Sequence, residues 1–192
     1  MQSKLEMLIS LKREIAQDTT LPLYGTANLV FGEGDIDCEV LFIGEAPGVE
    51  EDRLVRPFVG RSGKLLDKMI ESIGWKREQV YITNIVKRRP PDNRDPLPSE
   101  IEAYKPYLAK QIEIINPKII TTLGRFSMNY FLPTAKITRD QGKLFTFEKY
   151  KIFPLFHPAA ILRGTVPASE YELSFKKLRQ VLENIDLEFG PF

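Results

Sequence analysis

The chain of 192 residues is poor in the residues that build metal cages and covalent cross-links. It contains a single cysteine, Cys38, and a single histidine, His157. One cysteine excludes a disulfide framework and a thiolate cage for zinc or an iron–sulfur cluster. One histidine excludes a histidine-rich metal site. We therefore expect no bound metal.

Long apolar runs are also absent. No segment approaches the roughly 20 apolar residues that a membrane span needs, and the N-terminal segment MQSKLEMLISLKREI carries charges where a signal peptide needs an apolar core. We therefore expect a soluble, cytoplasmic protein. The 27 Lys and Arg residues nearly balance the 26 Asp and Glu residues. This balance neither supports nor excludes a nucleic-acid partner, because a local patch can bind one.

The order of the predicted elements indicates one α/β domain over residues 1–192. A composition of 43% hydrophobic and 28% charged residues is that of an ordinary globular domain. Apolar periodicity predicts strands at 39–43, 79–86, 117–123 and 151–156, and helices at 3–16, 65–73, 99–115, 125–130 and 169–184. Because strands alternate with helices, we expect a parallel sheet covered by helices on both faces.

Three local patterns refine these elements. Ser99 with Glu102 three residues later has the pattern of a capping box, which predicts that a helix begins there. Pro106 inside the same helix predicts a kink. The polar segment 137–148, which contains Gly142, resembles a hairpin or a loop.

The carboxyl ends of the four predicted strands carry the residues of greatest chemical interest: Gly44 with Glu45, Asn84, Gly124 and His157. In parallel α/β sheets, ligands bind at these ends. Asn84 either bonds the backbone or presents a donor and an acceptor to an amide-like base edge. His157 is either a structural strand-end residue or a catalytic one.

Two loops flank these ends. The segments GEAPGVEED (44–52) and RPFVGRSG (56–63) supply candidate bases and, in Phe58, an aromatic stacking platform. Their structural alternative is a loop with solvated acids and a phenylalanine that fills the core. The basic segment KRRPPDNR (87–94) either contacts phosphates or is a solvated loop.

Taken together and in this order, GEAPG, PFVGRSG, TNIVK followed by PP and NR, and FHPAAILR resemble the family 4 uracil-DNA glycosylases. The resemblance extends from FGEGD (31–35) to the last helix. It implies a three-layer α/β/α sandwich with a central four-stranded parallel sheet. It also implies a monofunctional hydrolase that cleaves the N-glycosidic bond of uracil in DNA and leaves an abasic site.

The resemblance also implies a role for each matching residue. Phe58 would stack on the uracil ring, Asn84 would pair with its polar edge, and His157 would donate a hydrogen bond to uracil O2. The backbone around Ala46 would line the pocket, and either Glu45 or Glu51 would position the attacking water. The residues expected to bind DNA are Arg61, Lys87, Arg89, Asn93, Arg94, Ile161, Leu162 and Arg163.

The chain departs from the family at the four cysteines that hold an iron–sulfur cluster. By spacing, those positions fall near Gln17, Thr20, Arg88 and Tyr104. We therefore expect no cluster. We further expect Arg88 and Tyr104, with Asp18, to fill its volume through an ion pair and aromatic packing.

The implied partner is uracil-containing DNA, bound by a monomer without membrane contact. Whether a repair or clamp partner is used does not follow from the sequence. One alternative is a non-catalytic protein of the same fold that recognises deaminated or single-stranded DNA. A second is a phosphate-binding α/β module, which the acids in GEAPG disfavour. RRPPDNR contains no histidine, which excludes the branch of the superfamily that bonds covalently to the sugar.

Overall fold

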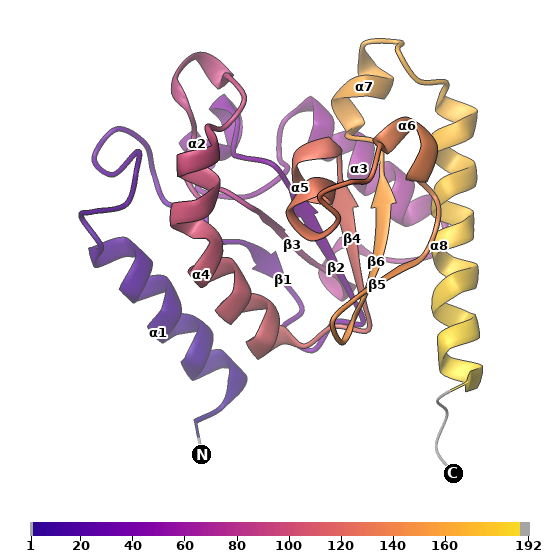
Figure 1. Cartoon of the computed structure of the whole chain (residues 1–192), viewed down its shortest axis with the longest axis horizontal. Helices are drawn as coiled ribbons and strands as arrows, with labels where there is room; N and C mark the ends of the chain where they lie inside the picture. The colour runs from indigo at the N-terminus through magenta and orange to yellow at the C-terminus, as the bar shows by residue number, and fades with distance from the viewer. Residues whose placement is uncertain (1, 189–192) are drawn as a thin grey trace.

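The computed structural model describes residues 2–188, with side chains to residue 185. Its helices and strands form three layers (Figure 1). The strands are β1 (Glu33–Gly34), β2 (Val40–Gly44), β3 (Tyr81–Asn84), β4 (Ile119–Leu123), β5 (Phe145–Phe147) and β6 (Tyr150–Leu155). The α-helices are α1 (Lys4–Gln17), α2 (Val49–Leu54), α3 (Arg61–Ser72), α4 (Pro98–Ile115), α5 (Arg125–Phe131), α6 (Ile137–Asp140), α7 (Pro158–Leu162) and α8 (Ala168–Glu188), and two 3-10 turns are η1 (Arg77–Gln79) and η2 (Pro91–Asn93).

The sheet is mixed and larger than predicted. Its order is β1-β3-β2-β4-β6-β5, and the four central strands are the four that the sequence predicts, all parallel. The expectation of only four strands is wrong, because β1 and β5 add antiparallel pairs at the two edges. With two and three residues, these edge strands are too short to produce an alternating apolar pattern.

The predicted start of the helix at 99–115 is corrected by the structure. Helix α4 begins at Pro98, and the Glu100 carboxylate accepts the Leu97 N–H at 2.8 Å. The capping role therefore belongs to Glu100 and not to the Ser99–Glu102 pair. Pro106 lies inside a helix that continues to Ile115.

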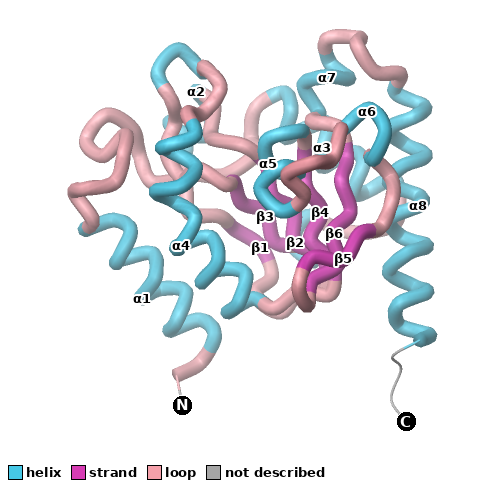
Figure 2. The backbone as a smooth tube through the Cα atoms, in the orientation of Figure 1, coloured by secondary structure: helices cyan, strands magenta, loops and turns pink. Residues whose placement is uncertain are grey.

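Helices lie over both faces of the sheet (Figure 2), and each face has its own hydrophobic core. Alternate residues of a strand point to opposite faces, so Phe42 packs with α3 and α8 while its neighbours Leu41 and Ile43 pack with α1 and α4. The Phe42 and Phe175 rings stack with centroids 6.1 Å apart. Among the described residues, no helix has the length and apolar character needed to cross a bilayer.

Gly63 allows α3 to lie directly against the loop that precedes it. A Cβ atom at this position would overlap the carbonyl group of Phe58, which is main chain and cannot rotate away. We predict that Gly63→Ala lowers the free energy of unfolding by about 1–3 kcal/mol, the usual cost of overpacking. Denaturant unfolding measures this loss. Lys64→Ala, at the exposed neighbouring position, is the control, and an equal loss in both variants would contradict the prediction.

Candidate active site at the carboxyl edge of the sheet

The strand ends converge as predicted. Gly44 at the end of β2 lies opposite Asn84 at the end of β3. The pairing continues beyond the strands, since the Ile85 and Val86 amides donate to the Gly44 and Glu45 carbonyls at 3.0 Å each. On the other side, the Gly124 N–H donates to the Leu155 carbonyl at 2.8 Å, which brings the end of β4 next to that of β6.

A small cavity of about 150 Å³ lies at this edge. The predicted uracil-binding residues Ala46, Phe58 and Asn84 all line it, as do the predicted catalytic residues Glu51 and His157. Gly48 and Ser62, which were not predicted, complete the lining. The Phe58 and His157 ring centroids are 5.9 Å apart. Gly44 makes this arrangement possible, because a Cβ there would lie 2.5 Å from Phe58 Cζ and would overlap the Asn84 amide oxygen.

Asn84 brings an unsatisfied acceptor to this cavity. The residue is 2% exposed, and its Oδ1 atom has no hydrogen-bond partner among the residues that the structure describes. A buried polar atom without a partner is costly and uncommon in native proteins. A ligand with an N–H group would satisfy it.

His157 is held as a neutral donor. Its Nδ1 atom accepts the Ala159 N–H at 3.1 Å, so the proton of the neutral ring is on Nε2. Burial, with a smaller contribution from Arg163, lowers the pKa of His157 to about 4. The imidazole is therefore uncharged near neutral pH and offers one N–H.

Glu45 lies in a larger cleft of about 610 Å³ that adjoins the small cavity at Ala46, Gly48 and His157. Burial and, to a smaller extent, the nearby Asp95 raise the pKa of Glu45, while Arg125 lowers it, and together they bring this pKa to about 7. A carboxylate with a pKa near 7 is suited to accept a proton from water at neutral pH.

Glu51, the other predicted base, holds the loop together. Its Oε1 atom accepts the Val59 and Gly60 amides at 3.0 and 2.8 Å, and its Oε2 atom accepts the Gly48 amide at 3.2 Å. Both oxygens are thus engaged by the backbone. Glu51 joins the start of α2 to the loop that carries Phe58.

Several of the predicted DNA-binding residues surround the larger cleft. Asn93, Arg94 and Arg163 line it. The Arg89 guanidinium donates to Asn93 Oδ1 at 2.8 Å, and Arg94 pairs with the buried Glu100 at 2.6 Å.

The remaining predicted contacts lie on two helices. Arg61 is exposed at the first position of α3, while Ile161 and the 40%-exposed Leu162 belong to α7. Arg125 and Asp95, which the sequence pattern did not indicate, also line the cleft and pair at 3.0 Å. The signal for Arg125 was its position directly after Gly124, at a strand end.

The prediction that Lys87 contacts DNA is wrong. Its side chain is 0% exposed and points into the interior, where Nζ donates to Thr83, to the Asn84 carbonyl and to Gln111. The reason is that the chain after β3 stays buried, with Ile85 and Val86 bonded to the main chain of Gly44 and Glu45, so the basic run begins inside the fold.

The four positions that correspond to cluster cysteines do not fit an iron–sulfur cluster. Gln17 and Thr20 are exposed, and the guanidinium of the buried Arg88 donates to the Tyr104 hydroxyl at 3.0 Å. None of the four side chains is a thiolate, and a buried cation repels iron. Within the described part of the chain, no group of three or more His, Cys, Asp or Glu is placed to hold a metal ion.

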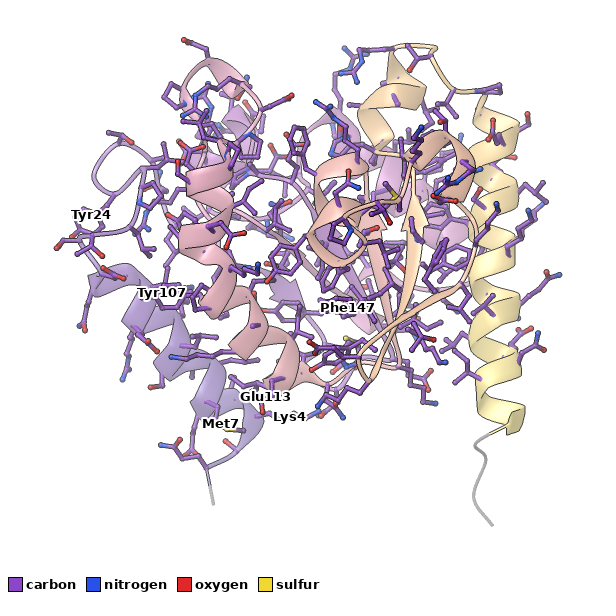
Figure 3. All side chains as sticks on the ribbon, in the orientation of Figure 1. Lys4, Met7, Tyr24, Tyr107, Glu113 and Phe147 are labelled. Atoms are coloured by element: carbon purple, nitrogen blue, oxygen red, sulfur yellow. The ribbon has the colours of Figure 1, made fainter. Side chains whose placement is uncertain are left out.

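The predicted contact between Arg88 and Tyr104 is confirmed, but Asp18 plays a different part. The Tyr104 hydroxyl donates to the Pro22 carbonyl at 2.8 Å, and the Tyr24 ring lies 5.2 Å from the Arg88 guanidinium. Asp18 accepts hydrogen bonds from Thr20 and from Tyr107, which lies where α1 meets α4 (Figure 3). The hydrogen bond from Tyr107 to Asp18, and not the expected ion pair, therefore joins the end of α1 to α4.

Comparison with known proteins agrees with this geometry. The Uracil DNA glycosylase superfamily profile matches residues 31–183. The Type-4 uracil-DNA glycosylase of Archaeoglobus fulgidus is 42% identical over 187 residues, which cover 92% of this chain and 94% of the relative. The Type-4 uracil-DNA glycosylase of Sulfurisphaera tokodaii is 49% identical over 80% of this chain and 74% of the relative. That of Thermotoga maritima is 41% identical over 85% and 88%. The chain belongs to the Uracil DNA glycosylase superfamily.

Proposed function

We propose that this protein removes uracil from DNA by hydrolysing its N-glycosidic bond, leaving an abasic site. The observation that carries the proposal is the unsatisfied Asn84 Oδ1 atom beside Phe58 and His157 in a small cavity. A planar ring with an N–H group between two carbonyl groups complements these three side chains. Family membership and the names of the relatives support the same reaction.

Recognition of the base follows from the donors and acceptors around the cavity. Phe58 stacks on the uracil ring. Asn84 Oδ1 accepts the uracil N3–H, and the amide nitrogen donates to O4. Cytosine has an acceptor at N3 and a donor at C4, so it opposes the same amide with the wrong pattern.

The chemical step divides between His157 and Glu45. When the C1′–N1 bond breaks, its electron pair moves onto the base and the sugar becomes an oxocarbenium ion. The Nε2–H of His157 donates to O2 and stabilises the developing negative charge. Water then forms the new C1′–O bond as its proton passes to the Glu45 carboxylate.

The larger cleft supplies the surface for the DNA strand. Arg89, Arg94 and Arg163 provide positive charge at or near the cleft, and we assign them to phosphate contacts together with Arg61 and Asn93. The exposed Leu162, with Ile161, occupies the place left by the extruded base. The protein acts as a monomer in this proposal.

The most direct test is incubation of the purified protein with an oligonucleotide that contains one uracil, followed by alkali. Strand cleavage at the uracil is the expected result, and an oligonucleotide with thymine at that position is the control. Binding without cleavage would contradict the proposal and would favour a non-catalytic DNA-binding protein.

The pH dependence of the reaction tests the role of Glu45. Because the ionised carboxylate accepts the proton, kcat/KM is expected to rise with pH and to level off above about 7. His157 does not produce this rise, since it is already neutral above pH 4. Glu45→Gln should be slower and should lose the rise. If the Glu45→Gln enzyme keeps the wild-type pH profile, the rise in kcat/KM comes from another group, and the role of Glu45 is contradicted.

Substitution of the base-reading amide tests selectivity. Asn84→Asp replaces the amide donor by an oxygen, so we predict that the ratio of uracil to cytosine excision rates falls roughly tenfold or more. Paired oligonucleotides that contain uracil or cytosine at one position measure this ratio. An unchanged ratio would place Asn84 outside the base-binding site.

We also propose that the protein works without an iron–sulfur cluster, because Arg88 and Tyr104 occupy the corresponding positions. The protein is expected to contain no iron above background and to show no visible absorption, even after anaerobic reconstitution with iron and sulfide. Activity should be unchanged by this treatment. A stoichiometric cluster would contradict the proposal.

Tyr104→Phe tests whether the contact between Arg88 and Tyr104 stabilises the fold at the positions of the cluster cysteines. Loss of the hydroxyl leaves the Pro22 carbonyl and an Arg88 N–H without their partner, which we predict costs about 1–3 kcal/mol of unfolding free energy. Tyr24→Phe keeps the ring that faces Arg88 and serves as the matched control. An equal loss in both variants would show that the hydroxyl is not the important group.

A further inference from the structure

Lys87 is a buried cation whose donors are all used inside the protein. Its Nζ atom donates to Gln111 Oε1 at 2.5 Å, to Thr83 Oγ1 at 2.6 Å and to the Asn84 carbonyl at 2.9 Å. An ammonium group has three N–H donors, so these bonds exhaust it. Burial lowers the pKa of Lys87 well below its ordinary value, which shows how unfavourable this environment is for the charge.

The partners of Lys87 extend the network to three segments. Gln111 on α4 donates to the Phe31 carbonyl at 3.1 Å and to the Tyr81 hydroxyl at 3.3 Å. The Thr83 hydroxyl also donates to the Phe31 carbonyl, at 2.8 Å. Lys87 therefore joins the end of β3 to α4 and to the chain that leads into β1.

This network lies on the face of the sheet opposite the candidate base-binding cavity. Side chains alternate along β3, so Thr83 faces α4 while Asn84 faces Phe58 and α3. Lys87 Nζ thus donates to the main-chain carbonyl of Asn84 from the α4 face of the sheet, opposite the cavity. Because Asn84 Oδ1 has no partner of its own within the described residues, its position depends on that main chain.

We infer that Lys87 is a positioning residue, which holds the carbonyl of Asn84 from the far face of the sheet and so fixes the amide that reads uracil. The inference rests on the proposed function for the role of Asn84. Lys87 does not act as a nucleophile, because its Nζ atom is on the wrong side of the sheet. Nor does it bind phosphate, because it is 0% exposed.

The split between kcat and KM tests this role. Lys87→Met is expected to lower kcat roughly ten- to hundredfold, the effect of a small displacement of a reading group, with little change in KM for DNA. Arg163→Ala, at the cleft, should instead raise KM. A Lys87→Met enzyme with raised KM and unchanged kcat would return Lys87 to a DNA-binding role and overturn the inference.

A double-substitution experiment separates positioning from general loss of structure. In an Asn84→Ala background there is no amide to position, so adding Lys87→Met is expected to change kcat less than about threefold. An equal fold-change with and without Asn84 would overturn the inference.

A milder pair of variants covers the case in which Lys87→Met does not fold. Thr83→Val removes one hydrogen-bond acceptor of Lys87 and, like Lys87→Met, should lower kcat. Thr121→Val is the matched control, because Thr121 is equally buried and its hydroxyl has no partner among the described residues. Equal kcat values for the two variants would contradict the inference.

Hydrogen exchange keeps the test independent of catalysis. Thr83→Val is expected to accelerate exchange at the Ile85 and Val86 amides, which bond to β2 next to Asn84, relative to Thr121→Val. A wild-type protein that does not excise uracil would refute the proposed function alone. Unchanged exchange at these amides would refute the positioning role of Lys87.

Discussion

The site depends on the parallel pairing of β2 with β3, which sets Gly44 opposite Asn84. Because Gly44 has no Cβ, the Phe58 ring and the Asn84 amide both lie over it. A slip of one residue in this register would turn Asn84 toward α4 and present a neighbouring side chain to the cavity. The α3 helix adds a second close approach at Gly63, against the main chain of Phe58. The cavity is therefore built mainly from backbone geometry.

Burial gives similar residues different tasks at this edge. It keeps His157 neutral, so that the ring donates without carrying charge, and it brings the pKa of Glu45 close to neutral pH. Glu51 is bound by three backbone amides and holds a loop. The adjacent cations Lys87 and Arg88 are both buried and support the fold. In the proposed function, the phosphate contacts therefore belong to the cations at the larger cleft.

The sequence predicted the central strands and the convergence of their ends, because buried parallel strands are continuous apolar runs that end at glycine or polar residues. It could not predict β1 and β5, whose short pairs depend on a neighbouring strand. Lys87 looked like part of a basic surface loop, since nothing in the local pattern shows that Gln111 lies above it. The choice between Glu45 and Glu51 likewise depends on backbone amides from distant positions. Arg88 and Tyr104 were paired correctly only because the family spacing brought both positions together.

In the proposed function, an extruded uracil is read by Phe58, Asn84 and His157 at the carboxyl edge of the sheet. The crystal structure of the protein with a duplex that contains 2′-fluoro-2′-deoxyuridine tests it directly, because the fluorine slows formation of the oxocarbenium ion. We predict that the base lies on Phe58, with N3–H on Asn84 Oδ1 and O2 on His157 Nε2. A uracil that stays stacked in the duplex, or that binds away from Asn84, would contradict this mode of base recognition.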